Sequence, residues 1–307
     1  MIFVVDKYVS GGNFSVKFPS SVVLCEVGLR DGLQNEKTLL STEDKLALLN
    51  GAIDAGFKVI EVGSFMHPKR VPQMADTDAL FRAVGEKEGV ERAAACGCKK
   101  VKLNVSASRA HNLKNLNMTP EQSVAGFKDC VTAALDSGIA ISGSISMPFA
   151  SPWDGVTPVE DVEAIIDAYL KVGIREISLS DTSGMATPRQ VADLCARVSE
   201  KFPEAVYWMH FHNTRGMAMA NIVAAMEAGM TRFDTSFGGL GGCPFVPGAA
   251  GNISSEDVIH MCDASGIATG IDVLQVMALS RRVSELLGHG LDSYVLRAGR
   301  SCDLIAE

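Results

Sequence analysis

The sequence predicts an α/β protein: a TIM-type (β/α)8 barrel followed by a helical extension at its C-terminal end. From residue 22 onward, short apolar runs alternate with helix-length segments, and the links between them are short. This alternation is typical of a parallel sheet covered by helices. The repeats in a chain of 307 residues come close to eight, which favours the barrel.

Seven apolar segments have the length and composition of buried strands. They occupy residues 22–27, 59–62, 102–105, 139–146, 176–179, 206–211 and 233–236. One helix is expected after Ser41, a capping residue followed by acids. Others are expected near 120–137, 158–172, 188–201 and 216–229. Three of these follow a Thr-Pro pair, at 119–120, 157–158 and 187–188, where Thr caps and Pro takes the first helical position.

The strand count falls one short of a closed barrel. Between a helix near 75–86 and the strand at 102–105, the chain has room for one helix but no further strand. Three alternatives stay open: a very short third strand, a gap filled by residues 3–9 or 14–18, or an incomplete barrel.

A single domain is predicted, with an N-terminal hairpin over 1–20, the barrel over 20–270 and the extension over 271–307.

Composition argues against several classes of protein. The net charge is −8 and no run of like charges occurs, which makes nucleic-acid binding through a basic face unexpected. No apolar stretch approaches the roughly 18 residues of a membrane span, and the N-terminus resembles neither a signal nor a transit peptide. The eight cysteines form no CxxC pair. We therefore expect a cytoplasmic protein with reduced thiols and no membrane partner.

The most informative pair of residues is His210 and His212, at the end of a predicted strand. Residues two apart on a strand point to the same side, so the two imidazoles could chelate a metal. Asp31, which follows the first strand, would add an oxygen ligand, and the amide oxygen of Asn252 a second. Such a mixed set suits Mg²⁺ or Mn²⁺, and Zn²⁺ less well. The alternatives are a pair of core histidines, a turn aspartate and an asparagine near a helix start.

Further polar residues fall at the carboxyl ends of strands, where barrel active sites lie. Arg30 offers a guanidinium for a developing enolate or carboxylate oxygen. Glu61 and Asp181 could pair with Arg30 or orient the ligands. Cys243 lies in a glycine-rich loop, Gly238-Gly-Leu-Gly-Gly-Cys-Pro, where a mobile thiol could transfer a proton; the alternative is an inert small residue.

These motifs resemble the 3-hydroxy-3-methylglutaryl-CoA (HMG-CoA) lyase family, within the superfamily of metal-dependent lyase and synthase barrels. The likeness covers roughly residues 20–290. It rests on the motifs at 27–37, 60–65, 68–74 and 177–182, on the His-x-His strand, and on 239–244 through 251–252. The Arg-Asp-Gly and His-x-His motifs are shared by the superfamily, whereas the Gly-Gly-Leu-Gly-Gly-Cys-Pro loop is more specific to the lyases.

The resemblance implies a metal-dependent retro-Claisen cleavage of an acyl-CoA, as in leucine catabolism. Its metal ligands would be Asp31, His210, His212 and Asn252, and its catalytic residues Arg30, Glu61, Asp181, His210 and Cys243. In this scheme His210 or Asp181 removes the hydroxyl proton, Arg30 holds the acetyl-CoA enolate, and Cys243 protonates it. Ser64 and Ser178 would contact CoA. The product beside acetyl-CoA would be acetoacetate, and a homo-oligomer is expected.

The sequence departs from the family pattern in three places. Ser142 and Ser144 stand where the family has Arg and Tyr, and Asn213 and Arg215 where it has Asp and Tyr. About a dozen residues are missing after Val84, where the family's third strand would lie. The first two departures indicate a different or larger acyl group, such as a longer 3-substituted glutaryl-CoA or a citramalyl-CoA. Two rival hypotheses stay open: a Claisen-condensing synthase, and an inactive barrel that acts as a binding protein.

Overall fold

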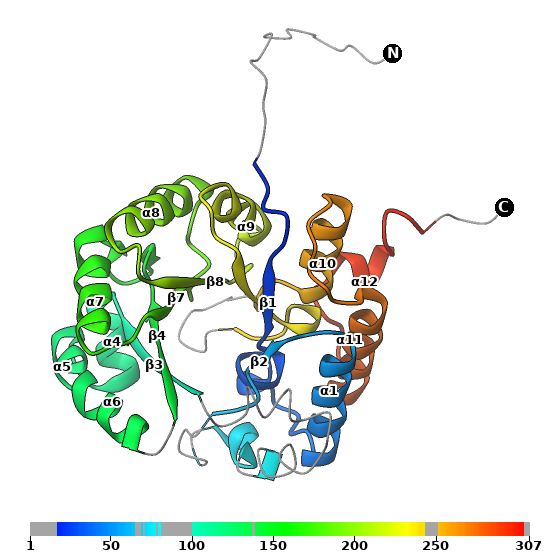
Figure 1. The fold of residues 1–307 in the computed structure, drawn as a ribbon. Coiled ribbons are helices and arrows are strands. Elements are labelled where there is room, and N and C mark those ends of the chain that lie inside the picture. Colours follow the sequence, from blue (N-terminus) through cyan, green and yellow to red (C-terminus); the bar gives the residue numbers. More distant parts are fainter. Residues whose placement is uncertain are drawn as a thin grey trace, which may run out of the picture.

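The computed structural model of this chain describes residues 17–64, 69, 71–77, 79–80, 100–136, 139–242 and 251–303. In that part of the chain, seven parallel strands form one sheet in the order β2-β1-β9-β8-β7-β4-β3. The strands are β1 (Val23–Glu26), β2 (Val59–Ile60), β3 (Lys100–Ser106), β4 (Ala140–Ser146), β7 (Glu176–Asp181), β8 (Val206–Phe211) and β9 (Arg232–Thr235). They curl around a common axis inside an outer ring of helices (Figure 1). The predicted TIM-type α/β fold is confirmed, and all seven predicted strands are present.

The helices alternate with the strands along the chain. They are α1 (Thr42–Asp54), α4 (Arg109–Leu116), α5 (Pro120–Ala125), α6 (Phe127–Asp136), α7 (Val159–Lys171), α8 (Pro188–Lys201), α9 (Ala218–Glu227), α10 (Ser255–Ala264), α11 (Val273–Leu287) and α12 (Tyr294–Ala298). Short helical turns are η1 (Gly28–Gly32), η2 (Leu33–Asn35), η3 (Pro72–Met74) and η4 (Phe237–Gly239), and a small antiparallel pair is formed by β5 (Ala150–Ser151) and β6 (Gly155–Val156). None of the described helices combines the length and the apolar character needed to cross a membrane.

The sheet is open in the part of the chain that is described. β2 and β3 are the two ends of the strand order, and no ladder joins them among the described residues. Residues 81–99, where the sequence predicts the shortfall of a strand, lie outside the described ranges, as does the hairpin expected around residues 10–13. Seven strands among the described residues fit a TIM-type barrel with a shortened or missing third strand, and the three alternatives for that strand stay open.

Two predictions about helices are wrong. The helix expected over 120–137 is interrupted at Gly126, which lies between the end of α5 and the start of α6. Glycine is a poor helix former, so a break there costs little. The cap expected at Thr157 is absent, and Pro158 precedes α7 without a side-chain cap. The hydroxyl of Thr157 donates instead to the carbonyl of Met147, at 2.7 Å. Thr119 and Thr187 do form the expected capping boxes.

Residues of each strand alternate between two environments. In β7, Ile177 and Leu179 are buried in the hydrophobic core, whereas Ser178 and Ser180 alternate with them. The Ser180 hydroxyl lies 3.4 Å from that of Ser144 on β4, so these serines share the side opposite to the core. The inside of the sheet is therefore lined by small polar side chains at this level.

The predicted C-terminal extension is confirmed as helical. Asp272 caps α11 by accepting the backbone N–H groups of Leu274 and Gln275, and α11 lies beside α1 (Figure 1). The carboxylate of Asp257 on α10 accepts bonds from Ser293 and from the first backbone amides of α12. The extension thus packs on the outer ring of helices as part of the same body.

Candidate metal centre

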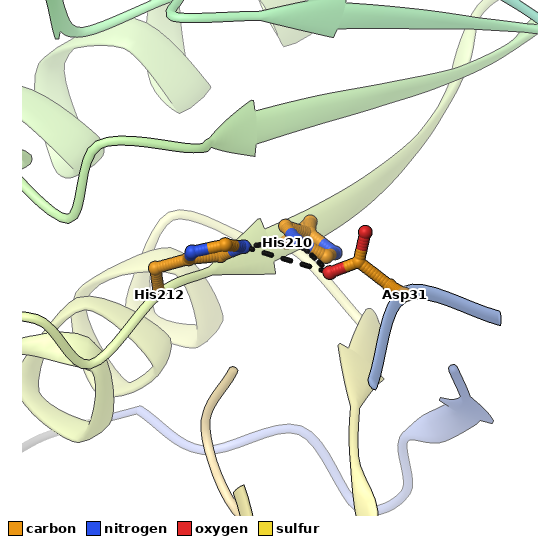
Figure 2. Close-up of side chains that lie close together, drawn as sticks. All are labelled: Asp31, His210 and His212. Carbon is orange, nitrogen blue, oxygen red and sulfur yellow. Dashed lines mark hydrogen bonds and ion pairs between the residues drawn. The ribbon is translucent and has the colours of Figure 1, made fainter. Parts of the chain in front are cut away.

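The end of β8 presents both predicted histidines to one point. His210 lies on the strand and His212 just beyond it, and both side chains are buried. Their Nε2 atoms are 3.1 Å apart (Figure 2). The alternation of strand side chains explains the pairing, because residues two apart face the same side. The two imidazoles converge as expected, and their role as metal ligands stays a prediction.

Asp31 reaches the two histidines from η1, the turn that follows β1. Its Oδ2 atom is 3.9 Å from Nε2 of His210 and 3.7 Å from Nε2 of His212 (Figure 2). Burial acts to raise the pKa of this carboxyl, but Arg30 and the two histidines outweigh it and hold the pKa well below its usual value. Asp31 is therefore an ionised oxygen donor facing two imidazole nitrogens.

Asn252 joins the group through its backbone as well as its side chain. The segment that contains it runs back along the end of β8: Ile253 N–H donates to the Phe211 carbonyl and Asn213 N–H to the Gly251 carbonyl, at 3.1 and 3.0 Å. The Nδ2 of Asn252 donates to Asp31 Oδ2 and to the Leu240 carbonyl, both at 2.9 Å. The amide nitrogen therefore faces Asp31, and a role for Oδ1 as a metal ligand requires the amide to turn over.

A carboxylate that the sequence analysis missed supports His210 from behind. Oδ2 of Asp234, on β9, lies 3.1 Å from His210 Nδ1. A hydrogen bond to Nδ1 directs the other nitrogen, Nε2, toward Asp31. Asp234 and His210 are register partners on neighbouring strands. An acidic residue inside the apolar strand at 233–236 was the available signal, but its partner depends on the strand order.

Arg30 is held beside the centre by two carboxylates. Its Nη1 donates to Asp31 Oδ1 at 2.8 Å and its Nε to Glu61 Oε2 at 2.6 Å. Glu61 follows β2 and also accepts from Lys102 of β3. Although burial acts to raise the pKa of Glu61, the two cations lower it to about 2. Glu61 is thus a permanent anion that orients Arg30, one of the roles that the sequence analysis considered.

Among the described residues, the others that the sequence predicts for the site form no side-chain hydrogen bond with the candidate metal ligands. Asp181 ends β7, and its carboxylate accepts the N–H groups of Met185 and Ala186 at 3.0 and 3.1 Å. Burial raises its pKa. Ser178 is 1% exposed within β7, beside Ser180, and Ser64 contacts Thr77 through its backbone. Cys243 lies outside the described residues. The CoA contacts of both serines stay predictions.

Below the centre, a buried glutamate connects the segments that surround it. Glu26, at the end of β1, is fully buried and accepts the N–H groups of Gly28 and Phe237 at 2.7 and 3.0 Å. It also accepts the hydroxyl of Ser255 at 2.6 Å. Burial raises its pKa to about 8, so the group is largely protonated at neutral pH. One side chain thus joins η1, η4 and the start of α10.

The donor set fits a divalent cation. One ligand atom each from Asp31, His210 and His212 lies within 4.8 Å of the others. The 3.1 Å between the two Nε2 atoms is close to the roughly 3.0 Å that separates adjacent ligands around an octahedral ion with bonds of about 2.1 Å. A half-buried carboxylate and two buried imidazoles are a mixed oxygen and nitrogen set of the kind that divalent ions bind.

Comparison of the sequence with known protein families gives a match. The HMGL-like family model covers residues 21–283, which include every described residue of the centre. The chain belongs to the HMGL-like family. The resemblance that the sequence predicted is thereby confirmed.

Individual relatives of the HMGL-like family are similar over almost their whole length. The (R)-citramalyl-CoA lyase of Chloroflexus aurantiacus is 36% identical, over 91% of this chain and 95% of that protein. The hydroxymethylglutaryl-CoA lyase YngG of Bacillus subtilis is 34% identical, over 92% and 99%. The solved structure of an HMG-CoA lyase from Acinetobacter baumannii, in complex with coenzyme A and 3-methylmalate, is 40% identical with a TM-score of 0.86, over 94% of this chain and 98% of that one.

Proposed function

We propose that this protein is a divalent-metal-dependent carbon–carbon lyase that cleaves a 3-hydroxyacyl-CoA by a retro-Claisen reaction. The supporting observation is the meeting of Asp31, His210 and His212 within reach of one cation, with Arg30 bonded to Asp31. Relatives named for the cleavage of hydroxymethylglutaryl-CoA and citramalyl-CoA support the reaction class.

In the proposed reaction, a base takes the proton of the 3-hydroxyl group and the bond between C2 and C3 of the acyl chain breaks. C3 becomes the carbonyl of a keto acid, and the electron pair passes to C2 and the thioester oxygen as an enolate. Protonation at C2 gives acetyl-CoA. HMG-CoA would yield acetoacetate as the second product, and citramalyl-CoA would yield pyruvate.

Each residue has a proposed part in this reaction. Asp31, His210 and His212 would hold Mg²⁺ or Mn²⁺, with Asn252 as the fourth ligand once its amide turns. The ion would supply Lewis acidity to the substrate's oxygens. Arg30, kept in place by Glu61, would stabilise the enolate oxygen. Cys243 stays the predicted donor of the proton to C2.

Two residues are candidate bases for the hydroxyl proton. His210 has Nδ1 bonded to Asp234 and Nε2 directed toward Asp31, so a His210 that holds the ion has no nitrogen left for that proton. Asp181 ends the neighbouring strand as the register partner of Phe211, and its carboxylate accepts the N–H groups of Met185 and Ala186. We therefore assign the ligand role to His210 and keep Asp181 as the candidate base, a role that requires its carboxylate to reach the side of the sheet on which His210 lies.

The substrate we propose differs from HMG-CoA in its acyl group. Ser142 and Ser144 place small hydroxyl side chains inside the sheet, where the family pattern has larger residues. A citramalyl-type or a longer 3-substituted glutaryl-CoA would suit this interior. We keep the predictions of a cytoplasmic location and a homo-oligomer, the latter to be checked by light scattering.

A panel of acyl-CoA thioesters tests the proposal. HMG-CoA, citramalyl-CoA and longer 3-hydroxy-3-substituted acyl-CoAs are each incubated with protein and Mn²⁺, and acetyl-CoA and keto acid are quantified. We expect equal amounts of both products from at least one thioester, lost with EDTA and in Asp31→Asn. Free CoA released from acetyl-CoA and a 2-oxo acid would instead identify a synthase. Absence of both reactions and of bound metal would support the inactive binding protein.

A further inference from the structure

A second cation, Lys102, lies close to the metal centre but contacts none of the candidate ligands. It projects from β3, and its side chain is 29% exposed. Its Nζ forms an ion pair with Glu61 and lies 3.7 Å from Oδ2 of Asp234. Glu61 follows β2, so the pair connects the two end strands of the sheet, between which no ladder exists among the described residues.

Each partner of Lys102 in turn orients one residue of the centre. Glu61 accepts from the Nε of Arg30, and Asp234 lies against Nδ1 of His210. Lys102 is therefore the one described cation paired with both supporting carboxylates. Outer contacts of this kind fix the orientation of the groups that meet a metal.

Lys102 adds a second cation beside the supporting carboxylates. Asp31, Glu61 and Asp234 provide three buried or half-buried carboxylates, and Arg30 reaches only the first two. Without the ammonium group, His210 would be the one described cationic partner of Asp234, and a buried carboxylate that loses a cationic partner is costly. Although burial alone would lower the pKa of Lys102, Glu61 and Asp234 outweigh it and raise the pKa. The side chain is thus a permanent cation.

The register of the sheet places this charge where the sequence departs from the family pattern. Lys102 is the direct register partner of Ser142 on β4, the position at which the family has arginine. Register partners in a parallel pair point to the same side of the sheet. A positive charge at this level of the interior therefore comes from the neighbouring strand.

We propose that Lys102 is a positioning residue of the metal centre, which holds Glu61 and Asp234 and through them fixes Arg30 and His210. The inference rests on the proposed function, since it concerns the same centre. It adds a residue that none of the motifs includes.

Mn²⁺ affinity provides the test, because it needs no substrate. Lys102→Met removes the charge and keeps a long, unbranched side chain. We expect Mn²⁺ binding, measured by electron paramagnetic resonance, to weaken roughly 10- to 100-fold. The kcat should fall to a similar extent. Lys102→Arg should retain most of both. The matched control is Lys100→Met, two residues earlier on the same strand and side, where the lysine pairs with Glu176 away from the centre. The Kd of the control for Mn²⁺ should lie within about twofold of the parent value, as for most substitutions at the surface.

The outcomes separate this inference from the proposed function. Unchanged Mn²⁺ affinity and kcat in Lys102→Met, or equal losses in Lys102→Met and Lys100→Met, would overturn the inference while leaving the proposed reaction intact. Loss of Mn²⁺ affinity in Lys102→Met, with no thioester cleaved by the parent, would support the inference and reject the substrate. If Lys102→Met and Lys102→Gln fail to fold while Lys100→Met folds, Lys102 is a folding element and the inference is also overturned.

Discussion

Buried carboxyl groups around the centre have different protonation states because they have different partners. Asp31 and Glu61 face cations, and the pKa of each is lowered. Asp181 and Glu26 accept neutral N–H and O–H groups, and burial raises the pKa of each. Neutral donors do not offset the loss of water as a full positive charge does. Residue type alone does not show which acid is ionised.

Glu26→Gln should change how the free energy of unfolding depends on pH. The pKa of Glu26 is raised from 4.5 to about 8 in the folded protein. Its contribution to stability is therefore complete below about pH 4.5 and is lost as the pH rises toward 8. Between these two pH values, the titration of Glu26 should lower the free energy of unfolding by up to about 1.4 kcal/mol per pH unit. Glutamine can still accept the N–H groups of Gly28 and Phe237 but does not titrate.

Urea denaturation from pH 5 to pH 8 measures this effect. The slope of unfolding free energy against pH should be shallower in Glu26→Gln than in the parent. The exposed Asp193 provides the control, and Asp193→Asn should leave the slope unchanged. Identical slopes in the parent and Glu26→Gln would contradict the assigned protonation of Glu26.

At the scale of elements, the segment after the glycine-rich loop is fixed by close backbone packing. Gly251 lies against the backbone of the η4 region, and a Cβ atom added to it would lie 1.8 Å from the carbonyl oxygen of Gly239. The atoms that such a Cβ would meet belong to the backbone of Gly239 and Gly241, so no side chain can rotate away to make room. The next residue is Asn252, so the packing at Gly251 sets the distance from this segment to Asp31.

Gly251→Ala should therefore weaken Mn²⁺ binding by at least about tenfold and destabilise the protein by roughly 1–3 kcal/mol, as overpacking does. Calorimetric titration with Mn²⁺ and thermal unfolding measure the two effects. Gly290→Ala is the control, since a Cβ atom there meets nothing within 4 Å. A Gly251→Ala variant that behaves like Gly290→Ala would show that the segment has more freedom than its contacts indicate.

Elements and site residues were predictable to different degrees. The strands at 139–146, 176–179 and 206–211 were found because apolar runs bounded by turns are a local signal. His210, His212 and Asp31 were found because metal-binding types follow strand ends, which meet in a barrel. Asp234 and Lys102 were missed because their roles come from register between strands distant in sequence. The break at Gly126 was missed because one glycine does not always end a helix.

At the scale of the whole molecule, the candidate metal centre brings distant parts of the chain together. Asp31 follows β1, His210 and His212 lie at the end of β8, and Asn252 follows β9. A ligand that binds only the folded form stabilises it by mass action. The sheet is open between β2 and β3 in the described part, so such a link should contribute noticeably to its stability.

Mn²⁺ should accordingly raise the Tm. At a concentration about 100 times the Kd, the expected stabilisation is about 2.7 kcal/mol, which corresponds to a rise of roughly 5 °C for a domain of this size. Scanning calorimetry with Mn²⁺ and with EDTA measures the difference. Asp31→Asn should show no rise. An equal rise in Asp31→Asn and the parent would place the bound ion elsewhere.

The backbone hydrogen bonds that hold Asn252 in place also allow the metal preference of the centre to be changed. Main-chain bonds join Ile253 to Phe211 of β8 and Gly251 to Asn213 just beyond it, so the side chain at position 252 can change while its Cα stays in place. Asn252→His would give three imidazoles and one carboxylate, a set that borderline ions prefer to hard ones. Competition between Zn²⁺ and Mn²⁺ should then shift toward Zn²⁺, and an unshifted competition would mean that residue 252 does not touch the ion. The selectivity of the centre would in that case be adjustable at one position on a rigid frame.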